Sequence, residues 1–294
     1  MRRLAPLLLL ATAALWPSQT TAAPDPAPPV GKRYVYKESE GVPQEMEIYF
    51  PPNWDPTQRS YPAIILFHGG GWGNGSLDAF RYQCHYLASR GMVAATANYT
   101  LAKKQSESPA GQSRKRVCIV DAKSAIRWMK AQAAWLGIDP ARLITGGGSA
   151  GGHISLLATH NPGLNDPRDP VGFDTSVAAY VLFNPALSPG DDQDSAVDMQ
   201  QHLNADMPPS IVFFGTEDKW KVGWDVVRGE LAASGVKNID EQLAPGAEHA
   251  FFNQQPWKDL TLIAADKFLT AQGFLQGPPS LTVPAGNEVL VKRK

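Results

Sequence analysis

The chain has 294 residues, of which 43% are hydrophobic and 19% charged, and it contains 26 glycines and 25 prolines. This composition is typical of a folded globular protein with many turns, and it excludes a disordered, collagen-like or coiled-coil chain. The 27 basic and 28 acidic residues give a formal net charge of -1 at pH 7. No global charge therefore favours nucleic acid or an anionic membrane, and we expect a small or neutral partner and no nucleic-acid partner.

Residues 1–23 have the pattern of an export signal. Arg2 and Arg3 precede an apolar run over residues 4–16 that is too short to span a bilayer, and small residues at 21–23 offer a cleavage site. An uncleaved membrane anchor is the alternative. We expect no other membrane-inserted segment and a mature protein that is periplasmic or secreted. Without the two leader arginines its charge is 25 minus 28, or -3. The proline-rich residues 24–32 follow as a linker.

Strands and helices alternate along the rest of the chain, as judged from apolar runs and their periodicity. The predicted strands are residues 33–37, 45–50, 63–68, 92–97, 142–145, 179–183, 210–214 and 239–243. The predicted helices are residues 77–90, 117–136, 149–159, 223–234 and 257–272. This alternation predicts an α/β fold with a mostly parallel twisted sheet, helices on both faces and the first two strands as an antiparallel edge. We expect one domain over residues 33–274 and a basic, proline-containing surface tail over residues 275–294.

A glycine-rich motif follows the predicted strand at 142–145. Gly147, Ser149 and Gly151 satisfy the pattern G-x-S-x-G, which places a serine on a tight turn between a strand and a helix. The pattern alone is weak, because a glycine-rich turn with Ser149 as a helix cap also explains it. Its position between a predicted strand and a predicted helix favours a nucleophilic serine.

A second glycine motif, His68-Gly69-Gly70-Gly71-Trp72, ends the predicted strand at 63–68. Successive glycines leave backbone N–H groups unobstructed, as needed to stabilise the negative charge that a carbonyl oxygen gains during attack. We predict that Gly70, Gly71 and the amide of Ala150 form this oxyanion hole. A flexible glycine loop is the alternative.

A serine nucleophile needs a base, and histidine is the suitable residue at neutral pH. His249 follows the last predicted strand on a loop that reaches the carboxyl edge of the sheet, so it is the candidate base. His202 is a weak rival. The other histidines are expected to be structural: His68, His85, His153 and His160.

A carboxylate is expected to orient the histidine and to stabilise its protonated form. Asp218 lies just beyond the carboxyl end of the predicted strand at 210–214, between Ser149 and His249 in the chain. The order Ser, Asp, His is the one expected on a sheet of this type. Glu217 and Asp225 are the rivals, and a plain surface carboxylate is the alternative.

The two cysteines, Cys84 and Cys118, either form one disulfide in an oxidising compartment or remain two buried thiols, because sequence spacing does not decide the geometry. No cluster of Cys and His has metal-ligand spacing, so no metal site is predicted.

The motifs together resemble the α/β-hydrolase superfamily, and within it the esterase and lipase branch with an HGGG loop, including acetyl esterase-like and hormone-sensitive-lipase-like enzymes. The resemblance rests on residues 68–72, 147–151, 215–218 and His249, and it extends over about residues 33–272. It implies an α/β-hydrolase fold and hydrolysis of short-acyl carboxylic esters through an acyl-serine intermediate, without a metal or organic cofactor. Trp72 and the export signal resemble bacterial carbohydrate acetyl esterases. Because little precedes the HGGGW loop, we expect a small cap or none, which disfavours long-chain lipids.

Three features bear on the substrate. Trp72 and Trp220 are candidates for stacking on a sugar ring, although tryptophans near a core are more often packing residues. The polar residues 184–209 form either a short lid or a solvated loop. The basic loop at 101–116 either contacts an acidic sugar or is a solvated face.

Two other function classes stay open. A peptidase or amidase would use the same triad, and a non-catalytic binding protein could share the fold, although it would not need the whole constellation. We expect a small-molecule or oligosaccharide ester as substrate, and the sequence predicts no oligomeric state.

Overall fold

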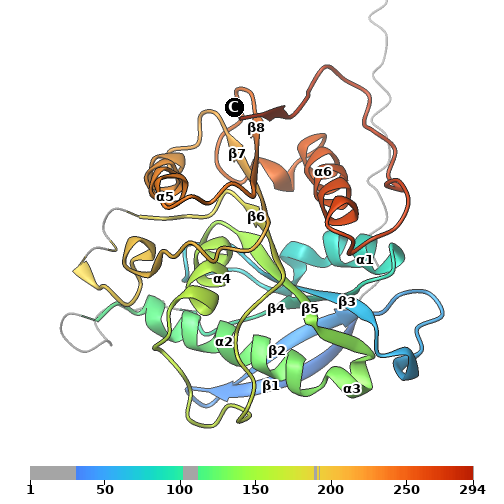
Figure 1. Cartoon of the computed structure of the whole chain (residues 1–294), viewed down its shortest axis with the longest axis vertical. Coiled ribbons are helices and arrows are strands. Elements are labelled where there is room, and N and C mark those ends of the chain that lie inside the picture. Colours follow the sequence, from blue (N-terminus) through green and yellow to red (C-terminus); the bar gives the residue numbers. More distant parts are fainter. Residues whose placement is uncertain (1–30, 102–111, 189–190, 192, 294) are drawn as a thin grey trace, which may run out of the picture.

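The computed structural model describes residues 31–101, 112–188, 191 and 193–293. The predicted export signal, residues 1–23, and all but the last two residues of the predicted linker lie outside the described residues. Within these ranges the chain forms one nine-stranded sheet with helices against both faces (Figure 1). No helix in the described part of the chain is both long and apolar enough to cross a bilayer.

The sheet runs in the order β1-β2-β4-β3-β5-β6-β7-β8-β9. The strands are β1 Lys32–Ser39, β2 Val42–Tyr49, β3 Tyr61–Phe67, β4 Val93–Ala97, β5 Ile138–Gly148, β6 Ala179–Phe183, β7 Ser210–Gly215, β8 Ile239–Ala244 and β9 Val291–Lys292. The strands from β4 to β8 pair in parallel, whereas β1 with β2, β2 with β4, and β8 with β9 pair antiparallel. The predicted fold class, with an antiparallel edge at the first two strands, is confirmed.

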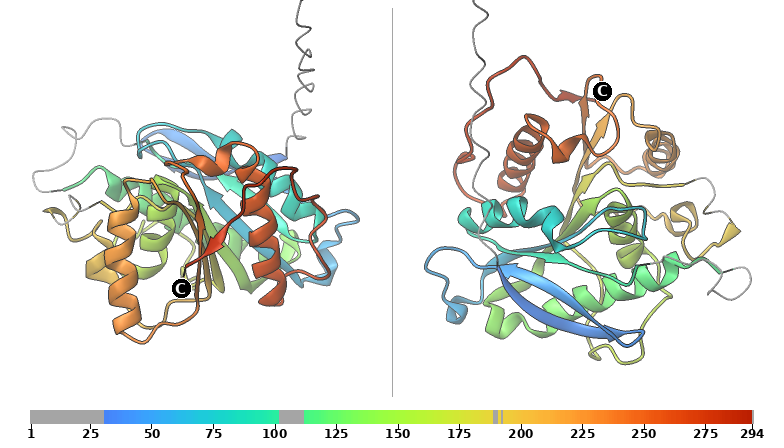
Figure 2. Two further views of the ribbon diagram at one scale, coloured as in Figure 1. Left: turned by 90° about the horizontal axis from the view of Figure 1, so that it is seen from above. Right: turned by 180° about the vertical axis from the view of Figure 1, so that it is seen from behind.

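The helices form two layers, one on each face of the sheet (Figure 2). The α-helices are α1 Arg81–Ser89, α2 Lys115–Ala131, α3 Ala133–Leu136, α4 Ala150–His160, α5 Lys221–Ala233 and α6 Trp257–Ala271. The 3-10 helices are η1 Pro56–Gln58, η2 Leu77–Phe80, η5 Met199–His202 and η6 Phe251–Asn253. Buried side chains of α1 and α6 pack on one face, and those of α2, α4 and α5 pack on the other.

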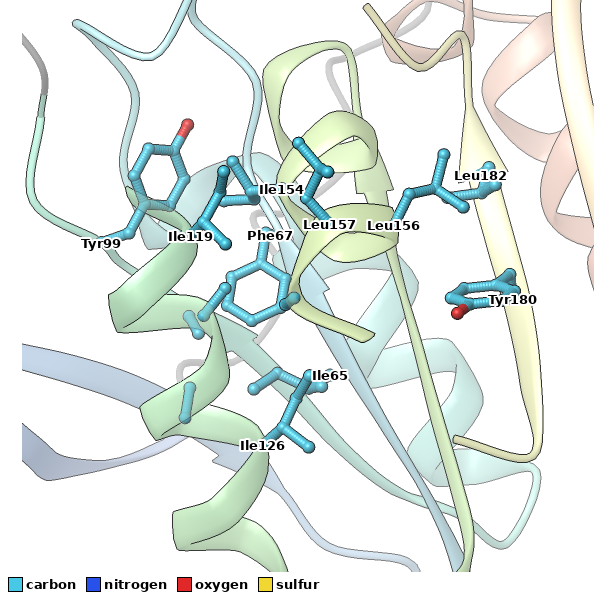
Figure 3. Close-up of a cluster of buried hydrophobic side chains, with 14 of the residues drawn as sticks. Ile65, Phe67, Tyr99, Ile119, Ile126, Ile154, Leu156, Leu157, Tyr180 and Leu182 are labelled. Atoms are coloured by element: carbon cyan, nitrogen blue, oxygen red, sulfur yellow. The ribbon is translucent and has the colours of Figure 1, made fainter. Parts of the chain in front are cut away.

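Successive side chains along the central strands point to opposite faces of the sheet, and so they contribute to a hydrophobic core on each face. On β3, Ile65 and Phe67 belong to the cluster under α2 and α4, while Ile64 and Leu66 belong to the opposite cluster under α1 and α6. Figure 3 shows Ile65 and Phe67 meeting Ile126 of α2 and Ile154 of α4. Burying each such side chain contributes about 1.5–3 kcal/mol, so β3 is held from both sides and its carboxyl end is a rigid base for the loop that follows.

Most elements differ from their predicted bounds by one to three residues, and three differ in a way that has a structural reason. The helix predicted at 77–90 begins as η2, capped by the Ser76 side chain, and becomes α-helical only in α1. The helix predicted at 117–136 divides at Gln132 into α2 and α3. Strand β5 begins before the predicted residue 142, because the buried Ile138 pairs with Tyr61 of β3, whereas residues 139–142 lie at a register shift, are partly or fully exposed and lack an apolar pattern.

The described residues of the tail are mostly exposed, and the tail also joins the sheet. Val291 pairs with Leu243 of β8, so the sheet has a second antiparallel edge. The Arg293 side chain forms ion pairs with Asp225 of α5 and with the buried Glu241 of β8. The sequence did not predict this pairing, because the tail is rich in proline and glycine and the pairing depends on backbone hydrogen bonds rather than on a side-chain pattern.

The two cysteines are buried, and no disulfide joins them. Cys84 lies in the core cluster under α1 and α6, and Cys118 lies in the cluster on the other face of the sheet. The sheet therefore separates the two sulfurs, and of the two alternatives the structure shows two buried thiols.

Candidate active site

Ser149 lies at the junction of β5 and α4, where the chain reverses sharply. Its φ is 52° and its ψ is -118°, a conformation that side chains rarely adopt. The glycines on either side allow this turn to pack against β3: a Cβ on Gly147 would lie 2.2 Å from the carbonyl oxygen of Phe67, and a Cβ on Gly151 would lie 1.9 Å from the same atom. The motif therefore presents the serine at the carboxyl edge of the sheet.

His249 connects Ser149 to Asp218 through its two ring nitrogens. Its Nε2 lies 2.8 Å from Ser149 Oγ, and its Nδ1 lies 2.7 Å from Asp218 Oδ2. The Asp218 carboxylate is fully buried, and its other oxygen accepts the backbone N–H of Trp220 at 2.9 Å. With Nδ1 protonated and donating to Asp218, Nε2 is free to accept the serine proton.

The loop that carries His249 is tied to the loop after β7. The amide of Glu217 donates to Ala247 O, and the amide of Gly246 donates to Thr216 Oγ1. A Cβ on Gly215 would lie 2.0 Å from Ala247 O, so the two loops touch through their backbones. These contacts bring the histidine to the carboxylate.

The rival residues lie elsewhere. Glu217 is exposed, and Asp225 forms ion pairs with Lys221 and Arg293. The His202 ring donates to Ser195 O. None of these three side chains has a described contact with Ser149 or His249.

The glycine loop after β3 lies directly beside the serine. A Cβ on Gly69 would lie 3.2 Å from Ser149 Cβ. Gly70 has a φ of 112°, and its carbonyl accepts the amides of Gly73 and Asn74, which closes the turn. Gly70 and Gly71 line the cavity in front of Ser149, and Ala150 begins α4, where the first N–H groups of a helix have no intrahelical acceptor.

The His68 side chain holds this loop in place through a hydrogen bond and a ring contact. Its Nδ1 donates to Gly69 O at 2.7 Å, its ring stacks on Tyr99, and Tyr99 donates to His68 O at 2.9 Å. Burial lowers the pKa of His68, so the ring is neutral at physiological pH. His68 is structural, as expected.

A cavity of about 500 Å³ opens at Ser149. Its polar end holds Gly70, Gly71, Ser149 and His249. Trp220 also lines the cavity, and further apolar wall comes from residues that the sequence analysis did not select: Ala79, Phe80, Ala250 and Phe252. No sequence motif marks these residues as cavity residues, because only the folded chain brings η2 and η6 together.

The two tryptophans have different surroundings. Trp220 lines the cavity, and its ring lies 6.2 Å from that of His249. Trp72 is only 7% exposed; its Nε1 donates to His153 Nδ1 at 3.1 Å, and the Lys115 ammonium lies 3.6 Å from its ring centre. The structure therefore brings Trp220 to the cavity and places Trp72 behind it as a packing residue.

Residues 184–209 cover α4 rather than Ser149. Val197, Met199 and Met207 belong to the core, and the described residues of this segment from 185 onward do not line the cavity at the serine. Asp191 contacts Lys115 and His153, and Asp194 pairs with Arg116. Burial by itself would raise the pKa of Asp191, but hydrogen bonds from His153 and Lys115 outweigh it and lower that pKa. The described part of the segment thus packs partly in the core and does not cover the cavity at the serine.

Most of the basic loop predicted at 101–116 lies outside the described residues, since positions 102–111 are not described. Its last residues pair with acidic side chains: Lys115 and Arg116 with Asp191 and Asp194, and Arg114 with Glu40. The described part of the chain also contains no group of three or more His, Cys, Asp and Glu side chains arranged to hold a metal ion.

A serine after β5, a carboxylate after β7 and a histidine after β8, on a sheet with this strand order, define an α/β hydrolase. Comparison with known proteins leads to the same class. Residues 46–185 match the family model described as BD-FAE. The apo structure of Thermogutta terrifontis esterase 2 is 34% identical to this chain, covers 87% of it and is itself covered completely, with a TM-score of 0.76. The chain belongs to the esterases of the α/β-hydrolase superfamily.

Two of the curated relatives come from Mycobacterium tuberculosis. The probable carboxylic ester hydrolase LipM is 30% identical over 60% of this chain and 46% of its own length, and carboxylesterase NlhH is 35% identical over 38% of this chain and 32% of its own. The chain thus aligns with less than half the length of these two relatives. Thermogutta terrifontis esterase 2 has also been described phosphorylated by paraoxon, in a structure 34% identical to this chain with a TM-score of 0.76.

Proposed function

We propose that this protein hydrolyses carboxylic esters through an acyl-enzyme formed on Ser149. The observation that carries the proposal is the continuous hydrogen-bonded arrangement of Ser149 Oγ, His249 and Asp218, at 2.8 and 2.7 Å. This arrangement can activate a serine hydroxyl, which is a poor nucleophile without a base.

The reaction proceeds in two halves. His249 Nε2 takes the hydroxyl proton while Ser149 Oγ bonds to the ester carbonyl carbon, and the resulting oxyanion accepts hydrogen bonds from the amides of Gly70, Gly71 and Ala150. The C–O bond to the alcohol breaks as His249 returns the proton to that oxygen. Water then attacks the acyl-serine, with His249 again taking and returning a proton, and the acid leaves.

We further propose that the acyl group is short and that the alcohol is polar, as in an acetylated carbohydrate. Phe80 and Phe252 bound the cavity at Ser149, are only 1% and 4% exposed, and stack with centroids 5.9 Å apart. Such an aromatic wall leaves little room for a long chain. Trp220, which lines the cavity and is half-buried, supplies a face on which a sugar ring can stack.

Replacing the nucleophile tests the reaction class. Ser149→Ala should lower kcat for p-nitrophenyl acetate by roughly four to six orders of magnitude with an unchanged circular dichroism spectrum. Paraoxon should add one diethylphosphoryl group to the wild type, detected by intact mass, and none to the variant. Retained ester hydrolysis in the variant would refute the assignment, and comparable cleavage of a p-nitroanilide by the wild type would favour an amidase.

We also propose that the protein is exported, because residues 1–23 have the pattern of a signal peptide. Amino-terminal sequencing of the protein recovered outside the cytoplasm should begin near Pro24. Recovery with Met1 intact and in the cytoplasm would exclude export.

A further inference from the structure

Asn184 is the residue directly after β6, and it lies beneath the triad. Its side chain is fully buried, and its backbone N–H donates to Phe213 O at 2.7 Å. Its φ is 39°, in the left-handed region where glycine and asparagine are the residues most readily accepted. The chain therefore turns directly after the strand, and the Asn184 side chain lies at the carboxyl edge of the sheet.

The Asn184 amide contacts the imidazole of His249. Its Nδ2 lies 3.3 Å from Nδ1 and 3.4 Å from Nε2 of that ring. The in-plane positions at these two nitrogens are already taken by Asp218 and Ser149. A point in the ring plane equally far from both nitrogens would overlap the Cε1–H group between them, so the amide lies against the face of the ring.

This contact is costly to maintain. The Asn184 Oδ1 atom is buried and has no hydrogen-bond partner among the described residues. An unpaired buried carbonyl and a positive φ both lower stability, and side chains with such costs gather at functional sites. For backbone conformation alone, glycine would serve without the unpaired oxygen.

The imidazole needs support on this side. The side chain of His249 is 28% exposed, and the residue after it, Ala250, has a φ of 64°. Asp218 is the charged group in described contact with the ring, and Glu248, the residue before His249 in the chain, is exposed. Rotation about the Cβ–Cγ bond would break the contacts to Ser149 and Asp218 together, unless something packs on the ring face.

We propose that Asn184 is a positioning residue that holds the imidazole of His249 in the orientation in which Nε2 meets Ser149. The proposal rests on the proposed function. The amide acts through His249 and touches neither the ester nor Ser149.

The test removes the amide and keeps the backbone. Asn184→Gly permits the positive φ; we expect kcat for p-nitrophenyl acetate to fall on the order of tenfold, with KM within twofold. The rate of paraoxon labelling at Ser149 should fall by a similar factor, because both reactions need His249 to take the serine proton. Asn184→Asp restores the shape, so it should recover most of kcat, and its added carboxylate should move the acid limb of the pH–rate profile to higher pH by favouring the protonated ring.

Asn98→Ala is the matched control. Asn98 also follows a strand, β4, and its Oδ1 is likewise buried without a described partner, but it has no described contact with His249. We expect kcat of this variant to stay within twofold of the wild type. Loss of kcat equal to that of Asn184→Gly would point to a general stability effect and overturn the proposal.

A measurement independent of turnover separates this proposal from the proposed function. The downfield proton resonance of the His249 Nδ1–H to Asp218 bond should be sharp in the wild type and broadened by exchange in Asn184→Gly. An unchanged resonance, with kcat and labelling rate within twofold of the wild type, would overturn the positioning role. An inactive wild type with the expected resonances would instead refute the proposed function.

Discussion

Phe252 defines the cavity at the scale of a single residue. Its ring packs against Phe80 and Phe183, with centroids 5.9 and 4.8 Å away, and a Cβ on Gly148 would lie 2.5 Å from the tip of the ring. The absence of a side chain at Gly148 thus makes room for the aromatic ring directly behind the serine turn. The size of this ring should limit the length of the acyl group.

Phe252→Leu should widen the cavity, because the shorter side chain leaves the space near Gly148 empty. We expect the ratio of kcat/KM for p-nitrophenyl hexanoate to that for the acetate to rise about tenfold, the scale of a pocket's discrimination between chains that differ by a few methylenes. A chain-length series from acetate to octanoate measures it.

Phe251→Leu is the control for this prediction. Phe251 is 5% exposed and packs on Trp257, but it does not line the cavity. Its variant should lose stability without changing the chain-length ratio. An equal change in both variants would mean that the ratio responds to general loosening of η6.

At this scale the sequence predicted residues that carry a motif and missed those that carry none. Ser149 and Gly70 lie in recognisable glycine patterns, and Asp218 and His249 follow predicted strands in the expected order. Asn184 also follows a correctly predicted strand, so its place at the sheet edge could be predicted from the sequence. Nothing in the sequence indicates that its amide contacts the imidazole of a histidine 65 residues later. Trp72 shows the reverse case, since this prominent residue of a motif is buried and does not line the cavity.

At the scale of elements, β9 protects the edge of the sheet. Without it β8 would expose a row of unpaired backbone groups, which promotes pairing between molecules. Arg293 also contributes to neutralising Glu241, which is buried in β8 and which Arg228 contacts at 2.8 Å.

Deleting residues 288–294 should lower Tm by several degrees and promote self-association, because it exposes the β8 edge and removes one of the two arginines at Glu241. Differential scanning calorimetry and light scattering after size exclusion measure the two effects. Lys292→Ala keeps the backbone pairing and loses only an exposed ion pair with Asp240, so it should behave as the wild type. Identical Tm and mass for the truncated chain would contradict a protective role for β9.

Elements with strong side-chain patterns were predictable, and those fixed by backbone pairing were not. The bounds of β6 coincide with the predicted 179–183, since every residue of that strand is apolar and buried. The start of β5 and the pairing of β9 escaped prediction because Ile138 is followed by residues without an apolar pattern and Lys292 is an exposed residue, so their strand conformation depends on a neighbour. The division between α2 and α3 at Gln132 has no glycine or proline to signal it.

For the whole molecule, two ionisable groups indicate how acid will affect folding. Burial, with a smaller effect from His202, lowers the pKa of His160 from 6.5 to about 4. Burial alone would raise the pKa of Glu47, but hydrogen bonds from Arg81, Tyr49, Gly31 and Arg33 outweigh it and lower the pKa from 4.5 to about 2. In both cases the unfolded chain binds the proton first as the pH falls, so stability decreases.

His160 should dominate the upper part of this range. Between about pH 6.5 and 4 the folded protein should lose roughly 3 kcal/mol through this group, and below pH 4.5 Glu47 should add a further loss that ends near pH 2. His160→Phe retains an aromatic ring beside Tyr180 and should flatten the dependence between pH 6.5 and 4, measured as the free energy of urea unfolding. His85→Gln, at an exposed position, should leave it unchanged. A slope that survives in His160→Phe would contradict this origin.

The strand order also sets when during folding the protein can become reactive. From β5 onward each strand pairs with the next one in the chain, so this half of the sheet can be assembled in sequence. Ser149 follows the first strand of that series, whereas His249 follows β8, with Asp218 in between. A partly assembled molecule would hold its nucleophile without its base, and so a folding intermediate that exposes Ser149 would be chemically silent until β8 has docked.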